Sequence, residues 1–333
     1  MMDIKGCQKS SGNSRVYYLS INKKEVTTPT YFPSVSSQAR YSVDSYVDVL
    51  CDYEFPRLLI SCYDLYDLKA KSLNNDLVSK INKFSTNGNV LFLDSGIYES
   101  SWRKDQNWLF ETYSEIVASV NCDFYSSFDI FRKPDEDYST FLERTVKKIN
   151  DSRNLETEDK LVPIVHGENA EALLRAVKSV IRAFDFRLRI ISVPERETGG
   201  DIMERAHTLK RIRKLLDQQG NDAILHVLGC GDPVSLALYI YSGADSFDSL
   251  DWLRFAIDPN EFVLRHLSHS VLFDCTCPYC SESKYSFFRV LLHNLHFYYR
   301  FLNDVRESII DDKMDGFLKN HFPLIRRKWW MIK

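Results

Sequence analysis

Short apolar runs alternate with longer stretches of helical period from about residue 58 onward, and this pattern restricts the fold more than any other feature of the chain. The runs are rich in β-branched and aromatic residues, whereas the stretches between them repeat apolar residues at steps of three and four. Such βαβα alternation predicts a parallel sheet covered by helices. The predicted strands are 58–62, 90–94, 123–129, 161–166, 188–193, 224–229 and 245–248. The predicted helices are 68–84, 107–119, 138–149, 168–184, 201–218 and 233–242.

An eighth strand in the region 29–35 closes these elements into a TIM (β/α)₈ barrel, for which about 250 residues is a usual size. An open, doubly wound sheet produces the same alternation. The open sheet is the weaker interpretation, because no glycine-rich dinucleotide or phosphate loop follows the first strands. We therefore predict an α/β fold built on a TIM barrel.

Acidic residues and a histidine stand at the ends of several predicted strands, namely Asp94, Asp129, His166 and Asp248. The carboxyl ends of barrel strands meet at one mouth, where active sites lie. Each aspartate taken alone is also a good N-cap for the following helix, but their recurrence at successive strand ends favours one shared cavity. Paired carboxylates suit reactions at an anomeric carbon, where one forms a covalent glycosyl intermediate and the other transfers a proton.

Three of the eight cysteines crowd together at Cys275, Cys277 and Cys280, ahead of an aromatic-rich helical stretch at 284–310. Three thiolates in one tight turn need a single further ligand to complete a tetrahedral zinc site. His293 is the candidate, and His296 is its rival one turn later. Four protein ligands leave no open position, so the spacing predicts a structural Zn²⁺.

These features divide the chain into four predicted parts. An N-terminal segment at 1–26 precedes the catalytic barrel at 27–260. A zinc-binding subdomain with the long helix that completes the barrel follows at 261–320, and a basic, aromatic tail occupies 321–333. The tail offers cations beside flat rings, which suit phosphates and bases, although its tryptophans could equally pack on the protein body. The residues concerned are Arg326, Arg327, Lys328, Trp329, Trp330 and Lys333.

Composition sets the remaining limits. The 333 residues are 44% hydrophobic, which suits a large globular core, and the apolar runs are far shorter than a membrane span needs. We therefore expect a cytoplasmic protein without a membrane segment. The net charge of −3 and pI near 6.3 lack the basic excess that is typical of nucleic-acid-binding domains.

An ordered set of motifs resembles the queuine tRNA-ribosyltransferases, also called tRNA-guanine transglycosylases, over about residues 27–310. The motifs are Thr-Pro-Thr-Tyr-Phe-Pro at 28–33, Leu-Asp-Ser-Gly at 93–96 with Tyr98, Phe-Asp at 128–129, Val-His-Gly at 165–167, Leu-Gly-Cys-Gly-Asp-Pro at 228–233, Gly-Ala-Asp-Ser-Phe-Asp at 243–248, Arg254, the cysteine cluster and His-Asn-Leu-His-Phe-Tyr-Tyr at 293–299. The set as a whole is specific, although no single motif is.

The resemblance implies a TIM barrel with a zinc subdomain that exchanges guanine in a nucleic acid for a free 7-deazaguanine base. It implies that Asp248 is the nucleophile that attacks C1′ and that Asp94 is the general acid/base, with ping-pong kinetics as a consequence. It assigns the following residues to substrate binding: Asp129 at the base edge, Tyr98 stacked on the base, the pocket residue Gly229, and Ser95, His166 and Arg254. It assigns the zinc to Cys275, Cys277, Cys280 and His293.

The chain departs from the family motifs around the implied base pocket. Glu99 replaces a glutamine, His166 replaces the glutamine of Val-Gln-Gly, and Pro194 replaces the glycine of Leu-Ala-Val-Gly-Glu. The interval from Cys280 to His293 is also shorter than is usual in the family. Divergence of this kind, with the aspartates retained, resembles the paralogues that insert 7-deazaguanines into DNA.

We therefore predict a transglycosylase with DNA as the favoured substrate and tRNA as the alternative. Two further alternatives stay open. One is a non-catalytic partner subunit, in which loss of the nucleophile is expected although Asp248 is present. The other is an unrelated barrel glycosidase, in which the cysteine cluster has no role. A homodimer or an accessory protein completes the predicted partners, by analogy alone.

Overall fold

The computed structural model describes residues 2–67, 72–184, 188–218, 220, 222–280, 286–328 and 331. Within them, eight strands form one sheet in the order β10-β9-β8-β5-β4-β13-β12-β11, and the pairings along it are parallel. A parallel bridge between Ile164 and Ser192 joins the two outer strands, so the sheet curls into a barrel. The strands are β4 (Thr30–Val35), β5 (Arg57–Ser61), β8 (Val90–Asp94), β9 (Phe124–Ser126), β10 (Leu161–Val162), β11 (Ile190–Pro194), β12 (Ile224–Leu228) and β13 (Ser246–Ser249). The predicted barrel is confirmed, including its eighth strand.

Two strands are shorter than predicted, because their backbone donors turn to other partners. β10 ends before Pro163, which has no N–H with which to continue the ladder. β9 ends at Ser126, and two residues later the N–H of Phe128 donates to Ser152 Oγ (3.0 Å) on α5. The segments of 123–129 and 161–166 beyond these short strands lead as loops toward the barrel mouth.

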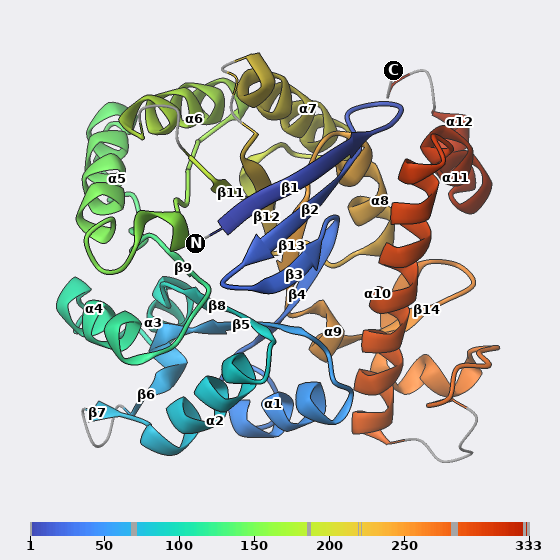
Figure 1. The fold of residues 1–333 in the computed structure, drawn as a ribbon, viewed down its shortest axis with the longest axis horizontal. Helices are drawn as coiled ribbons and strands as arrows, with labels where there is room; N and C mark the ends of the chain where they lie inside the picture. The colour runs from blue at the N-terminus through green and yellow to red at the C-terminus, as the bar shows by residue number, and fades with distance from the viewer. Residues whose placement is uncertain are drawn as a thin grey trace.

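Helices surround the barrel on its outside (Figure 1). The six predicted helices are present as α2 (Asn75–Thr86), α4 (Phe110–Ser119), α5 (Tyr138–Ser152), α6 (Ala170–Ala183), α7 (Ile202–Gln218) and α8 (Pro233–Tyr241). The sequence did not lead us to expect α1 (Val43–Asp52), α3 (Ile97–Trp102) or α9 (Asp251–Arg254).

The start of α2 corrects the prediction of a helix from residue 68. Residues 68–71 lie outside the described residues, and Ser72–Leu73 forms β7, which pairs with β6 (Tyr66–Asp67). The helix begins only after Asn74, whose side chain accepts a hydrogen bond from the N–H of Leu77. An Asn cap of this kind fixes a helix start.

A three-stranded antiparallel sheet closes the amino end of the barrel. It consists of β1 (Met2–Lys9), β2 (Arg15–Ile21) and β3 (Lys24–Thr27) and lies across the barrel in Figure 1. Its buried residues pack with those at the starts of the barrel strands in one apolar cluster, formed by Met2, Tyr17, Leu19, Ile21, Val26, Phe32, Leu59, Val90, Phe92, Phe124, Val162, Ile190 and Ile224. Apolar side chains of the described residues fill this end, so we look for the ligand site at the carboxyl ends of the strands.

The chain beyond the barrel forms a β-hairpin and a long helix. The hairpin is β14 (Phe255–Asp258) with β15 (Val263–His266), and the predicted helix at 284–310 is α10 (Phe287–Ile310). The short helices α11 (Met314–His321) and α12 (Pro323–Arg327) follow. Trp329, Trp330 and Lys333 of the predicted tail lie outside the described residues, and the division at residues 26, 260 and 320 stays a prediction. None of the described helices is both long and apolar enough to cross a membrane.

Candidate active site

A cavity of about 500 Å³ opens at the carboxyl ends of the strands, where the sequence placed its acidic residues. Asp94 from β8, Asp248 from β13 and Asp129 from the loop after β9 all line it. We call it the aspartate cavity. His166, Tyr98, Gly229 and Arg254 also line it, so the structure brings seven of the eight predicted substrate-site residues together.

Ser95 is the exception among the predicted residues. Its side chain is fully buried and is not among the described residues that line the aspartate cavity. Its carbonyl oxygen accepts a hydrogen bond from Trp108 Nε1 (2.9 Å), which ties the loop after β8 to the protein body. In this structure the Ser95 backbone therefore anchors the loop that follows Asp94.

Three donors hold the Asp248 carboxylate. Ser34 Oγ donates to Oδ2 (2.7 Å), and the N–H of Gly229 donates to Oδ1 (3.2 Å). His226 Nε2 also lies 3.2 Å from Oδ1, and its Nδ1 lies 2.8 Å from Ser246 Oγ. A carboxylate is an acceptor, so Nε2 carries the proton of this contact, and the contact fixes the imidazole orientation.

Sequence reasoning missed Ser34 and His226. Both stand at positions that alternate with outward-facing residues along β4 and β12, so a period-two reading of the inward face could have found them. His226 is completely buried inside the barrel, directly adjacent to Asp248. The buried His226 ring therefore holds the Asp248 carboxylate in its orientation.

Gly229 is a glycine for a conformational reason. Its φ is +80°, a left-handed value that L-residues with a side chain rarely adopt. This turn directs the Gly229 N–H at Asp248 just after β12 ends. A side chain at this position would also point into the open space of the cavity, because no atom lies within 4 Å of an added Cβ.

Asp94 has a different environment from Asp248. It accepts a hydrogen bond from the N–H of Gly96 (3.0 Å), and Ser126 Oγ lies 3.2 Å from its Oδ1. Burial raises the pKa of Asp94 to about 6, and the nearby charges of Asp129 and Asp248 act in the same direction. A carboxyl group with this pKa can both give and take a proton near neutral pH.

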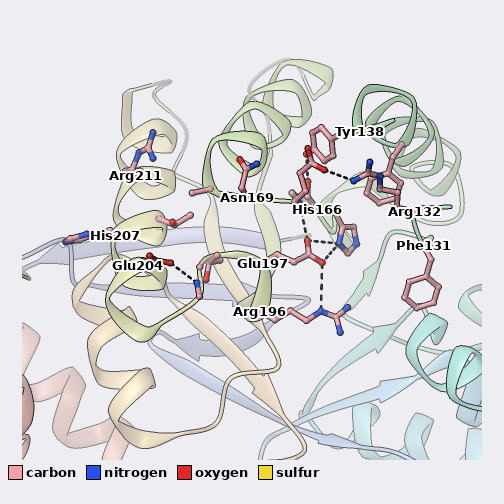
Figure 2. Close-up of a pocket in the computed structure, with 18 of the residues that line it drawn as sticks. Phe131, Arg132, Tyr138, His166, Asn169, Arg196, Glu197, Glu204, His207 and Arg211 are labelled. Carbon is pink, nitrogen blue, oxygen red and sulfur yellow. Dashed lines mark hydrogen bonds and ion pairs between the residues drawn. The ribbon is translucent and has the colours of Figure 1, made fainter. Parts of the chain in front are cut away.

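Asp129 is the first of three side chains that are linked by hydrogen bonds in the order Asp129, His166, Glu197. His166 Nε2 lies 2.7 Å from Asp129 Oδ1, and His166 Nδ1 lies 3.0 Å from both carboxylate oxygens of Glu197. Burial alone lowers the pKa of His166, but the two carboxylates outweigh it and raise the pKa to about 10. Figure 2 shows His166 and Glu197 facing each other. Since both ring nitrogens of His166 are occupied, the ring orients Asp129 and leaves Asp129 to meet a ligand.

Aromatic and charged side chains surround the mouth of the aspartate cavity. Tyr98 and Trp102 on α3 are 37% and 65% exposed, which leaves both rings free to contact a ligand. Arg254 at the end of α9 brings a positive charge. Deeper in the cavity, burial and the charges of Asp64 and Asp94 raise the pKa of Glu99 to about 8. Glu99 therefore takes up a proton more readily than an exposed glutamate does, and its Oε1 accepts a hydrogen bond from Ser36 Oγ (2.9 Å).

The cysteine cluster forms a compact group with His293, as predicted. One ligand atom from each of Cys275, Cys277, Cys280 and His293 lies within 4.8 Å of the others. His293 Nε2 donates to the carbonyl of Ile257 (2.8 Å), so its Nδ1 faces the sulfur atoms at 3.3 to 3.6 Å. His296, the rival ligand, instead contacts Tyr53 OH through its Nδ1 (3.2 Å). Three thiols and an oriented imidazole match the donor set of a structural zinc site.

The fold is a closed parallel barrel with carboxylates at its mouth and a Cys₃His group beside it. These features define a class of (β/α)₈ proteins with a site for small ligands. The sequence of residues 9–325 matches the family model described as queuine tRNA-ribosyltransferase, and the chain belongs to this family.

Curated relatives agree with this family at low identity. The chain is 25% identical over 243 residues to the tRNA-guanine(15) transglycosylase of Haloferax volcanii, with 67% of the chain and 46% of the relative covered. It is 24% identical to that of Thermococcus onnurineus, with 90% and 53% covered. It is 23% identical to that of Methanobrevibacter smithii, with 94% and 49% covered. The chain spans about half the length of the curated relatives it matches.

Proposed function

We propose that this protein exchanges guanine in a nucleic acid for a 7-deazaguanine base through a covalent link between Asp248 and the sugar. The observation that carries the proposal is the pair Asp94 and Asp248 in one cavity, with different surroundings. Asp248 is held by three donors, which suits a carboxylate that is fixed in position to attack. Asp94 has a pKa of about 6, which suits a group that exchanges a proton.

The reaction we propose has two halves. In the first, an Asp248 oxygen bonds to C1′ while the bond from C1′ to N9 of guanine breaks, and protonated Asp94 supplies a proton to the departing base. In the second, Asp94 removes the N9 proton of the incoming base, whose N9 then bonds to C1′ and releases Asp248. The proton that leaves Asp94 in the first half returns in the second, so the protein ends unchanged.

Asp129 and Tyr98 complete the proposed base site. The carboxylate of Asp129 can accept from the N1 and N2 donors of guanine, and the His166 bond fixes its direction. Tyr98 is exposed enough to stack on the base. A base reaches this cavity only after it leaves its stack in the polymer.

We propose DNA as the polymer. The chain departs from the family motifs at Glu99, His166 and Pro194 but keeps Asp94 and Asp248, and such divergence with retained aspartates resembles the DNA-modifying paralogues. Transfer RNA is the second candidate, and the names of the relatives, tRNA-guanine(15) transglycosylases, favour it.

We further propose that the Cys₃His group holds Zn²⁺. The ion would fasten the loop containing Cys275, Cys277 and Cys280 to α10. Its four protein ligands leave no place for substrate, so the role is structural.

The test is incorporation of radiolabelled guanine into duplex DNA and into tRNA. The unchanged protein should label DNA, and Asp248→Asn and Asp94→Asn should lower the rate at least about 10³-fold. Asp44→Asn, on the exposed face of α1, is the matched control and should label at the normal rate. Label in tRNA alone would replace DNA by the second candidate. Equal labelling by the protein and by Asp248→Asn would overturn base exchange.

A further inference from the structure

Glu197 holds two consecutive residues of the loop that follows β10. Both of its carboxylate oxygens lie 3.0 Å from His166 Nδ1, and its Oε2 also accepts from the N–H of Gly167 (3.1 Å). Glu197 ends the short 3₁₀-helix at Glu195–Glu197, directly after β11. In Figure 2 its side chain points toward His166. Its contacts therefore connect the loops that follow two neighbouring barrel strands.

The contacts of the His166 ring require a proton on each of its nitrogens. Nδ1 faces Glu197, and Nε2 lies 2.7 Å from Asp129 Oδ1. An ionised carboxylate only accepts hydrogen bonds, whereas a neutral imidazole has one N–H to donate. Only the positively charged ring satisfies both contacts. Burial lowers the pKa of His166, but the two carboxylates outweigh it and raise the pKa to about 10, in agreement with the geometry.

Other titratable groups surround His166, but among the described residues none of them contacts its ring nitrogens. They are Tyr138 on α5, which donates to the His166 carbonyl (2.7 Å), Arg132 and Glu168, which pair with each other (2.5 Å), and Arg196, 4.0 Å from Glu197. Arg132 and Glu168 offset each other's charge, and the Arg196 side chain is 67% exposed, so water screens it. Asp129 and Glu197 therefore determine the charge of the ring.

Asp129 is held through one of its two carboxylate oxygens. Its Oδ1 contacts His166 Nε2 and also accepts from the N–H of Ile130 (2.7 Å), whereas the described residues supply no hydrogen bond to Oδ2. Asp129 lines the aspartate cavity together with Asp94 and Asp248, whose negative charges repel its own. A cation at Oδ1 offsets this repulsion and leaves Oδ2 to accept from a ligand.

We propose that Glu197 is a positioning residue for recognition of the base: it keeps the His166 ring charged and turned toward Asp129, and so fixes the carboxylate that the base meets. The inference rests on the proposed function and adds a residue that does not itself touch the base. An uncharged amide, which the family motif has in place of His166, would gain no charge from Glu197. The effect of Glu197 therefore depends on the histidine.

The first test measures the dissociation constant of free guanine by calorimetry at pH 7.5. Glu197→Gln keeps the size of the side chain but removes its charge, and it should weaken guanine binding about tenfold, as loss of one hydrogen bond to a charged group does. Glu197→Asp keeps the charge on a shorter side chain and should lie between Glu197→Gln and the unchanged protein. Glu204→Gln is the matched control, because Glu204 accepts from the N–H of Gly200 (2.9 Å), and it should change binding less than about twofold.

A second background tests whether Glu197 acts through His166. In His166→Gln, the further change Glu197→Gln should alter guanine affinity less than about twofold, because the ring on which Glu197 acts is absent. A tenfold loss in both backgrounds would mean that Glu197 supports the loop in another way, and it would overturn the inference.

The pH dependence gives a third readout. A raised pKa of about 10 keeps the His166 ring charged below that pH in the unchanged protein. Glu197→Gln removes one of the two charges that raise it, so the ring loses its proton at lower pH. The ratio of the dissociation constants of Glu197→Gln and the unchanged protein should therefore grow from pH 6 to pH 9. Asp94 and Glu99 titrate in this range in both proteins, so their effects cancel in the ratio. A constant ratio would contradict the inference.

The outcomes separate this inference from the proposed function. Guanine binding that Glu197→Gln leaves unchanged, or that Glu204→Gln weakens equally, would overturn the inference alone. Absence of guanine binding by the unchanged protein would overturn the proposed function and the inference together.

Discussion

At the scale of single residues, the two proposed catalytic carboxylates differ in what surrounds them. The pKa of Asp94 is raised to about 6, so Asp94 is protonated below that pH and ionised above it. Release of guanine uses the protonated form, and its single-turnover rate should fall as pH rises through about 6. Uptake of the incoming base uses the ionised form, so its rate should rise through the same range. Measuring both half-reactions from pH 5 to 8 checks this, and two rates that rise together would contradict it.

His226 should act on the reaction by holding Asp248 in place. His226→Phe keeps the ring volume but removes the bond to Asp248, and it should slow formation of the covalent adduct by roughly 10²-fold, the cost of a misplaced reacting group. His226→Gln retains a donor and should recover part of the rate. Adduct is counted by denaturing electrophoresis. Base affinity should stay unchanged, and a matching loss of base affinity would point to a general structural role instead.

At the scale of elements, a buried ion pair joins α7 to the start of β13. Arg213 and Asp245 are both fully buried, and Arg213 also donates to the carbonyls of Ala223 and Gly243, each at 2.9 Å. Arg213→Met leaves the Asp245 charge without its partner and should lower the free energy of unfolding by about 3–5 kcal/mol. Arg211→Met, on the same helix with an exposed partner, should cost less than about 1 kcal/mol. Urea titration measures both, and similar losses in the two variants would refute the assignment.

The helix α10 connects the proposed zinc site to the aspartate cavity. His293 near its start belongs to the Cys₃His group, and one turn later Tyr298 OH donates to the carbonyl of Gly231 (2.8 Å), in the loop that carries Gly229. We expect Cys277→Ser to lose bound Zn²⁺ and to lower the melting temperature by several degrees. Cys51→Ser, at an exposed cysteine outside the group, should do neither. Elemental analysis and calorimetry make the comparison, and full zinc content in Cys277→Ser would exclude the site.

At the scale of the whole molecule, the sequence predicted the features that follow from hydrophobic periodicity and from the residues at strand ends. The barrel, its six main helices and the gathering of Asp94, Asp129, His166 and Asp248 follow from alternation and from the common mouth of parallel strands. The role of each residue came from the family resemblance and stays a proposal.

Features that depend on contacts far apart in the chain were not predicted. One such contact is the hydrogen bond between His226 and Asp248. Another is the set of hydrogen bonds that links Asp129, His166 and Glu197. In both cases the side chains come from different elements. The local sequence pattern does not indicate which residues on different elements will contact each other. The N-terminal sheet is a different case, because polar and apolar residues alternate over Tyr18, Leu19, Ser20 and Ile21 in β2, which is a local signal of a strand.

The barrel is closed at one seam by very few bonds. β10 has two residues, and beyond it the contact with β11 consists of the bridge at Ser192 and its neighbouring hydrogen bonds. The loops that follow these two strands carry His166 and Glu197 to the edge of the aspartate cavity, whereas Asp94 and Asp248 stand on strands paired along both edges. We therefore expect that mutations at this seam change which base the proposed site prefers, while Asp94 and Asp248 keep their positions on firmly paired strands.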